Sequence, residues 1–141
     1  MKTIATLIVI LHLAVVMVHG KAHQQLHIDP STWQRVFIVT VILIGPVLAM
    51  VLLWTRFRKI GYVVLLATMA GALAFGLAYH FLVHGSDNAL ELQSGPWESL
   101  FRSTSIWLAV TEVAAVVWSV FALQRDRVNE SSERKADRAW S

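Results

Sequence analysis

The six histidines of the chain fall into two groups with the spacing of a helix. Four of them follow one another at intervals of 7, 4 and 4 residues: His12, His19, His23 and His27. At about 3.6 residues per turn, these intervals place all four side chains on one helical face. His80 and His84 repeat the four-residue interval later in the chain. Because imidazole is the commonest metal ligand and exchanges protons near neutral pH, the pattern indicates metal, haem or proton chemistry.

A single carboxylate, Glu112, lies well inside the long apolar stretches of the sequence. An ionisable group within a membrane is costly and by default marks a functional site, with a partner close by. His12 is expected at a similar depth, so we predict that His12 and Glu112 form a coupled pair that handles protons. Small and polar residues flank Glu112 at helical intervals, which is typical of a face that packs against other helices: Ser105, Leu108, Ala115 and Ser119. The alternative is a single structural hydrogen bond between two helices.

The composition excludes several classes of protein. Of the 141 residues, 56% are hydrophobic and only 15% are charged, which is too apolar for an ordinary soluble domain. The absence of cysteine excludes disulfides, zinc fingers and cysteine nucleophiles. The net charge of +3 comes from basic residues in connections and in the tail, where they orient a membrane protein, so no nucleic-acid partner is expected. Phosphate-binding, dinucleotide and nucleophile-elbow motifs are missing, so a soluble-type enzyme is not expected.

Four apolar stretches have the length needed to cross a bilayer, which is about 20 residues. They run over 3–20, 36–54, 60–83 and 104–123, and the first could continue as helix to position 27. The first stretch resembles a secretory signal, but His12 in its apolar centre favours a retained helix. Gly45-Pro46 predicts a kink in the second stretch. We therefore expect a transmembrane domain at 1–123 and a polar, partly helical tail at 124–141.

The charges of the connections predict an orientation. Arg56, Arg58 and Lys59 crowd the short second connection, whereas the connection 84–103 carries mainly acidic residues. By the positive-inside rule, the basic connection and both termini face the cytoplasm. The expected fold is an all-α, antiparallel four-helix bundle, N-in and C-in, in the plasma (inner) membrane. This arrangement brings five histidines to the outer end of the bundle: His19, His23, His27, His80 and His84.

Three functions remain open at this point. The first is a metal or haem site with a role in electron transfer or metal handling. The first and third apolar stretches would be diagonal neighbours roughly 13 Å apart, a gap that suits a b-type haem between His19 and His80. The surplus histidines favour a copper or zinc ion instead, and its ligands would come from the five histidines at the outer end. The second is a non-catalytic accessory subunit of a larger membrane complex or a homo-oligomer, in which the histidines and Glu112 pack against the partner. The third is a quinone or proton site that uses His12 and Glu112.

Overall fold

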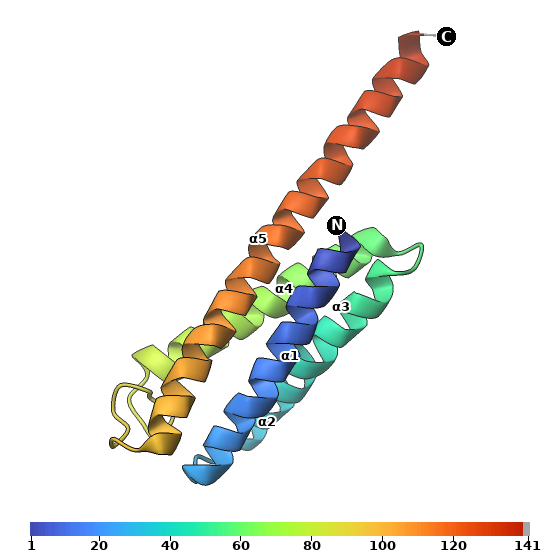
Figure 1. Cartoon of the computed structure of the whole chain (residues 1–141). Coiled ribbons are helices and arrows are strands. Elements are labelled where there is room, and N and C mark those ends of the chain that lie inside the picture. Colours follow the sequence, from blue (N-terminus) through green and yellow to red (C-terminus); the bar gives the residue numbers. More distant parts are fainter. Residues whose placement is uncertain (140–141) are drawn as a thin grey trace.

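The computed structural model describes residues 1–139, and in that part of the chain all regular structure is helical (Figure 1). The elements are α1 (Lys2–Gln25), α2 (Thr32–Phe37), the π-helical segment η1 (Ile38–Ile44), α3 (Gly45–Leu53), α4 (Arg58–Leu77), the π-helical segment η2 (Ala78–Leu82) and α5 (Pro96–Ala139). The segments α2, η1 and α3 follow one another without a break, as do α4 and η2. The chain therefore forms four long helices, which confirms the predicted all-α, four-helix architecture.

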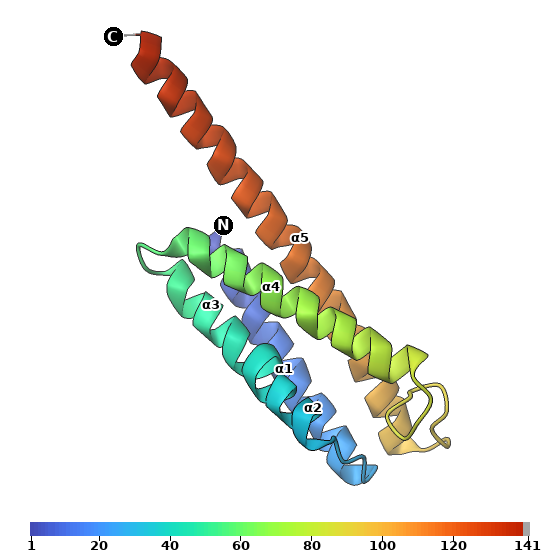
Figure 2. The same cartoon turned by 180° about the vertical axis from the view of Figure 1, so that it is seen from behind.

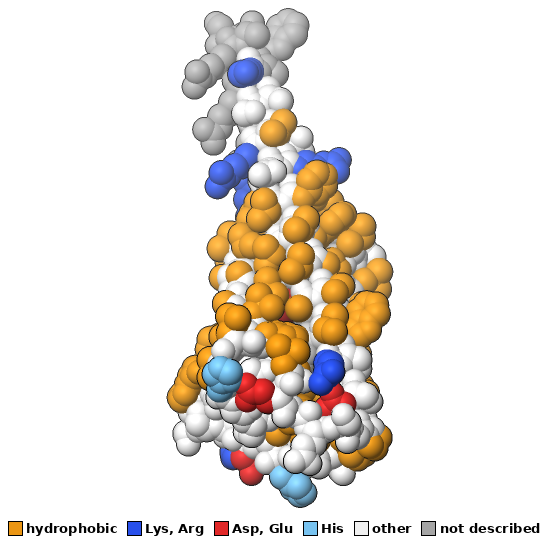
Figure 3. All heavy atoms as spheres, turned by 90° about the vertical axis from the view of Figure 1, so that its left-hand side faces the viewer, with side chains coloured by type: hydrophobic (Ala, Val, Ile, Leu, Met, Phe, Trp, Pro, Cys, Tyr) orange, Lys and Arg blue, Asp and Glu red, His pale blue; other side chains and the backbone are white. Residues whose placement is uncertain are grey.

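All four helices are long and apolar enough to cross a membrane. The candidate spans are Lys2–Gln25, Thr32–Leu53, Arg58–Leu82 and Pro96–Asn129. Large apolar side chains are exposed along each of them, and they form a continuous orange band on the face drawn in Figure 3. Such a surface is typical of helices that contact lipid. The chain is thus a candidate multi-pass membrane protein, and its orientation remains a prediction.

The four helices pack as a bundle with α1 and α4 on its diagonal. Helix α5 packs along both α1 and α4, and α3 packs along α4, whereas α1 and α3 touch over a shorter stretch. Figures 1 and 2 show the same arrangement from two opposite sides. We call the end that carries the connections 26–31 and 83–95 the distal end, and the end with the connection 54–57 the proximal end.

The predicted kink at Gly45-Pro46 appears as a change in helix type. The segment η1 is a π-helix in which the backbone hydrogen bonds span five residues instead of four. Pro46 then lies in the first turn of α3. Because η1 runs directly into α3, the missing N–H of Pro46 leaves one carbonyl of η1 without its intrahelical hydrogen bond. The wider turn before Pro46 accommodates the proline ring without ending the long helix.

Helix α5 is longer than the predicted fourth span. It begins at Pro96, which is 104 − 96 = 8 residues before the predicted start, and it continues without a break through the predicted tail to Ala139. Figure 1 shows this C-terminal part projecting beyond the rest of the bundle. The division at 123 and the cytoplasmic location of the tail remain predictions.

Helices α3 and α4 approach each other closely at Gly61 on α4. A Cβ atom added there would lie 2.9 Å from the backbone nitrogen of Leu53 and 3.1 Å from the carbonyl oxygen of Ala49, both on α3. Backbone atoms cannot move aside as a side chain can, so we expect Gly61→Ala to destabilise the bundle by about 1–3 kcal/mol, the usual cost of overpacking. Thermal unfolding in detergent, followed by circular dichroism, measures the change.

The matched control for this substitution is Gly20→Ala on α1. A Cβ atom at Gly20 would meet nothing within 4 Å, so this variant should unfold at the wild-type temperature or slightly above it. Equal destabilisation by both substitutions would show that the cost comes from something other than the α3–α4 contact.

Candidate metal centre

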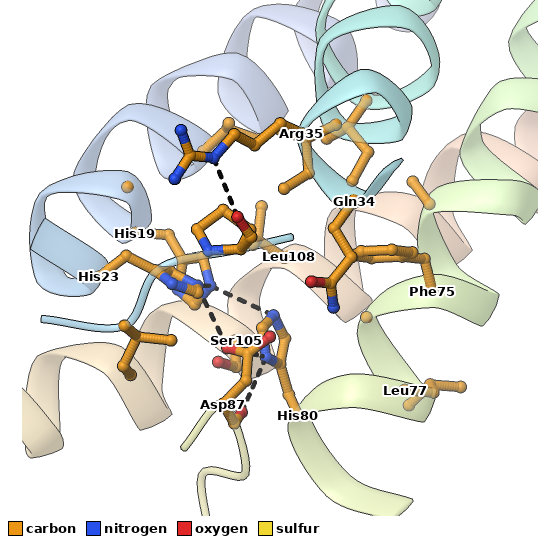
Figure 4. Close-up of a pocket in the computed structure, with 18 of the residues that line it drawn as sticks. His19, His23, Gln34, Arg35, Phe75, Leu77, His80, Asp87, Ser105 and Leu108 are labelled. Atoms are coloured by element: carbon orange, nitrogen blue, oxygen red, sulfur yellow. Dashed lines mark hydrogen bonds and ion pairs between the residues drawn. The ribbon is translucent and has the colours of Figure 1, made fainter. Parts of the chain in front are cut away.

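Three histidines from α1 and η2 converge at the distal end of the bundle (Figure 4). The Nε2 atom of His19 lies 3.3 Å from Nε2 of His80 and 3.2 Å from Nε2 of His23. His19 and His80 are each only 6% exposed, and His23 is partly buried. The two diagonal helices therefore bring imidazole nitrogens into direct contact in the interior of the bundle.

A threonine on α5 fixes the protonation pattern of His19. The hydroxyl of Thr104 donates its single proton to the carbonyl oxygens of Leu100 at 2.7 Å and Phe101 at 3.0 Å. Its oxygen is therefore an acceptor for His19 Nδ1, which lies 2.9 Å away. With the proton of the neutral ring on Nδ1, the Nε2 atom of His19 presents a lone pair to the other two histidines.

The connection 83–95 fixes His80 in the same way. The Nδ1 atom of His80 lies 3.2 Å from the backbone carbonyl of Asp87, which can only accept a hydrogen bond. The carboxylate Oδ1 of Asp87 lies 3.2 Å from the same nitrogen. These acceptors favour the neutral His80 tautomer with its proton on Nδ1 and the lone pair on Nε2. Two Nε2 lone pairs only 3.3 Å apart repel each other unless a proton or a metal ion lies between them.

Two of the three distances between the nitrogens match those around a tetrahedral metal ion, and all three nitrogens lie within 4.8 Å of one another. With metal–nitrogen bonds of about 2.0–2.1 Å, neighbouring ligands of a tetrahedral ion lie about 3.3–3.4 Å apart. Ligands at right angles, as in square-planar copper(II), would lie only about 2.8–3.0 Å apart at the same bond length. The observed separations of 3.2 and 3.3 Å favour the tetrahedral arrangement.

The surroundings of the three histidines restrict their movement. The ring of Phe101 packs against all three imidazoles, with centroid distances of 4.7, 4.9 and 5.2 Å. The connection that carries Asp87 is tied to its neighbours by bonds from the Ala89 amide to the His80 carbonyl at 2.9 Å and from Arg102 Nε to the Ala89 carbonyl at 3.2 Å. Partners that orient ligating histidines raise the affinity of a metal site. Asp87 Oδ1 also lies 3.4 Å from His23 Nε2, which adds negative charge beside the centre.

A pocket of about 470 Å³ lies beside the three histidines, between α1, the η1 helix, α4 and α5. Its walls are mostly apolar, and Glu112 lines it together with Ser105. Glu112 is only 3% exposed and makes no hydrogen bond or ion pair within residues 1–139. A metal ion held by three imidazoles would retain a fourth position for a ligand, and the pocket supplies the space for one.

Two of the predicted ligands lie outside this group because the helices end before them. Helix α1 ends at Gln25, and His27 has a left-handed backbone with φ of 54° and an exposed side chain at the rim of the pocket. The segment η2 ends at Leu82, and the extended Val83 directs His84 outward, where its side chain is 92% exposed. His84 hydrogen-bonds to Glu91 and holds the pKa of that carboxyl below its ordinary value.

His12 and Glu112, the predicted coupled pair, make no direct hydrogen bond with each other in the described part of the chain. Both side chains are buried, but His12 Nδ1 lies 3.3 Å from the hydroxyl of Thr111, the residue that precedes Glu112. Consecutive helix residues are rotated by about 100°, so Thr111 faces His12 while Glu112 faces the pocket. The predicted proton role of the two residues is therefore not supported by a direct contact between them.

The predicted haem between His19 and His80 does not fit this geometry. Two histidines on opposite faces of a haem iron need nitrogens roughly 4 Å apart, twice a metal–nitrogen bond of about 2 Å, with the macrocycle between the rings. Here the nitrogens are 3.3 Å apart, and the rings meet edge to face with an interplanar angle of 69°. Two imidazole side chains span the diagonal of the bundle by themselves and leave no slot for a flat macrocycle.

The comparisons with known proteins found no relative of this chain. The chain matches no protein family model, no curated protein and no solved structure. The chemistry of the three-histidine group must therefore be argued from its own geometry.

Proposed function

We propose that this protein is an integral membrane metalloprotein that binds one tetrahedral transition-metal ion, Zn²⁺ or Cu⁺. The ligands are the Nε2 atoms of His19, His23 and His80. The observation that carries the proposal is the 3.3 Å separation of the Nε2 atoms of His19 and His80, each of which belongs to a ring whose Nδ1 atom has a hydrogen-bond acceptor on the opposite side. Imidazole nitrogen is a favourable ligand for both ions.

The number of ligands favours a reactive site over a structural one. Structural zinc sites use four protein ligands, whereas catalytic sites use three and leave one position open. In this protein the open position faces a largely apolar pocket that also contains Glu112. We therefore propose that the ion is exchanged with a carrier or, if it is copper, alternates between Cu⁺ and Cu²⁺ by exchanging one electron with a redox partner. Glu112 would act as a proton donor or acceptor in the pocket without ligating the ion.

The test uses Co²⁺ as a coloured substitute for Zn²⁺. The full-length protein, purified in a neutral detergent and stripped of metal, should bind one Co²⁺ per chain and develop the intense visible bands of tetrahedral cobalt. Zn²⁺ should abolish the bands by displacement, and Cu⁺ should bind with the same stoichiometry. The variant Glu112→Gln, which keeps the shape of the side chain, should behave as the wild type because Glu112 is not a ligand.

Other outcomes would contradict the proposal in distinct ways. A folded protein that binds neither Co²⁺, Zn²⁺ nor Cu⁺ would contradict the metal site and favour the accessory-subunit hypothesis. A protein that purifies with the absorption spectrum of a haem would show that the three histidines rearrange around a macrocycle. Weak bands of six-coordinate cobalt would contradict the tetrahedral geometry.

A further inference from the structure

A groove of about 830 Å³ lies at the proximal end of the bundle, opposite the metal centre, between the start of α1, the connection 54–57 and α5. Five cationic side chains line it: Lys2, Arg56, Arg58, Lys59 and Arg125. We call these five residues and the space between them the basic groove. Among the residues whose side chains the structure describes, one carboxylate, Asp126, lines the same space. Cationic side chains therefore outnumber the described carboxylates in the basic groove.

The single carboxylate of the groove is already engaged. Asp126 accepts hydrogen bonds from Arg58 Nη2 at 3.2 and 3.3 Å. Several of the other cations lie against groups that do not neutralise them. Lys2 Nζ lies 4.2 Å from the centre of the Trp54 ring, Arg56 lies 4.9 Å from that of Phe57, and Arg125 contacts the sulfur of Met1 at 3.8 Å. Contacts of this kind leave the formal charge of the side chain uncompensated.

The N-terminus of α4 adds to the positive potential of the groove. This 20-residue helix has no side-chain cap and no acidic residue in its first turn, which instead begins with Arg58 and Lys59. The N-terminal end of a helix carries a partial positive charge and free N–H groups, so acidic residues or bound anions stabilise it. The free N–H groups at this end are favourable partners for an anion bound in the groove.

A buried hydroxyl supplies an independent indication of a ligand. Tyr62, one turn along α4 from Arg58, lines the groove and is only 1% exposed. Its hydroxyl is buried and has no hydrogen-bond partner in the part of the chain that the structure describes. Buried polar groups nearly always have a partner, so an unpaired hydroxyl facing a cationic groove indicates an acceptor that comes from outside the chain. An anionic oxygen satisfies the hydroxyl and the cations together.

We propose that the basic groove binds the phosphate group of an anionic membrane lipid. The groove lies where the apolar surface ends, and Figure 3 shows basic side chains gathered at that end of the apolar band. A surrounding bilayer would place its headgroups at this level. Clusters of Lys and Arg beside membrane helices attract anionic lipids, and pockets of such residues between helices bind their headgroups. Inorganic phosphate shares the chemistry but lacks the acyl chains that would hold it at the apolar surface.

The experiment measures lipid binding by native mass spectrometry and by thermal stability in a neutral detergent. Phosphatidylglycerol should bind at a defined stoichiometry and raise the unfolding temperature, and phosphatidylcholine should do neither. Arg56→Gln and Lys59→Gln should each weaken phosphatidylglycerol binding about fivefold, the change that corresponds to about 1 kcal/mol per basic residue. Tyr62→Phe, which keeps the ring in the core, should also weaken it.

The control is Lys21→Gln, which removes one cation from the distal part of α1 and should leave lipid binding unchanged. If Lys21→Gln and Lys59→Gln weakened phosphatidylglycerol binding equally, the binding would depend only on net charge. That result would contradict a specific site in the basic groove. Equal binding of phosphatidylcholine and phosphatidylglycerol would contradict the proposal that the basic groove selects an anionic lipid. Inorganic phosphate at the same concentration could raise the unfolding temperature as much as phosphatidylglycerol does. That result would contradict a lipid ligand and identify a soluble phosphate instead.

Discussion

Replacement of His80 by alanine is expected to lower the affinity of the protein for Co²⁺ or Zn²⁺ by more than about 100-fold, because loss of a ligand should exceed the 10–100-fold cost of losing a residue that only orients one. His80 provides the only ligand from the α4 side of the bundle among the three histidines. Its removal leaves two imidazoles from α1, which cannot hold a tetrahedral ion across the diagonal. Titration of the stripped protein with Co²⁺ measures the change.

The matched control for this prediction is His84→Ala. His84 stands four residues further along the chain but is exposed and bound to Glu91. Its removal should leave the cobalt spectrum and affinity unchanged. If His84→Ala weakened binding as much as His80→Ala, the distal connection would have to fold differently from the structure, with both histidines at the ion.

The second large loss of metal affinity is expected from Thr104→Val, although Thr104 is not a proposed ligand of the ion. Valine keeps the shape of threonine but cannot accept the hydrogen bond from His19 Nδ1. The ring of His19 then loses the interaction that keeps its proton on Nδ1 and its lone pair on Nε2. We expect the metal affinity to fall by about 10–100-fold, the usual effect of removing a group that orients a ligating histidine.

Two further variants show whether this effect comes from the hydroxyl itself. Thr104→Ser retains a hydroxyl that can bond to the Leu100 carbonyl and should restore most of the affinity. Ser103→Ala removes the neighbouring exposed hydroxyl, which bonds only to the Leu100 carbonyl, and should bind Co²⁺ as the wild type. Wild-type affinity in Thr104→Val would show that the tautomer of His19 is fixed by another group.

The sequence predicts the helices and the diagonal pair of histidines because both depend on simple periodicity. Apolar length defines the spans, and in an antiparallel bundle the first and third spans run in the same direction. His19 and His80 therefore reach the same end of the bundle from opposite corners. The structure confirms the helical bundle and brings these two side chains together with His23.

The same periodicity fails where a helix ends. A four-residue interval places two side chains on one face only if the helix continues through both, and the backbone leaves the helix before His27 and His84. Spacing also does not fix how a helix is rotated about its own axis, so Thr111 rather than Glu112 meets His12. The exact end of a helix and the rotation of its face depend on packing that no single stretch of sequence contains.

The residues that orient the ligands were not among the predicted site residues. Thr104 is an ordinary helix threonine in the sequence, and its role depends on a hydroxyl proton directed at its own backbone. Asp87 lies in the connection 83–95, where only the folded path returns its carbonyl to His80. A carboxylate seven residues after a histidine near a helix end is the one signal that pointed toward this contact.

The π-helical segment that carries His80 has a consequence for how this centre could be inherited or lost. A π-helical turn contains one residue more than the α-helical turn it replaces. The direction of the His80 side chain relative to α4 is therefore set by a length of chain as well as by the identity of a residue. A one-residue deletion at Ala78 or Tyr79 would restore a regular α-helix and rotate His80 by about 100° relative to α4. Such a deletion could keep all three histidines in the sequence while turning His80 away from the other two.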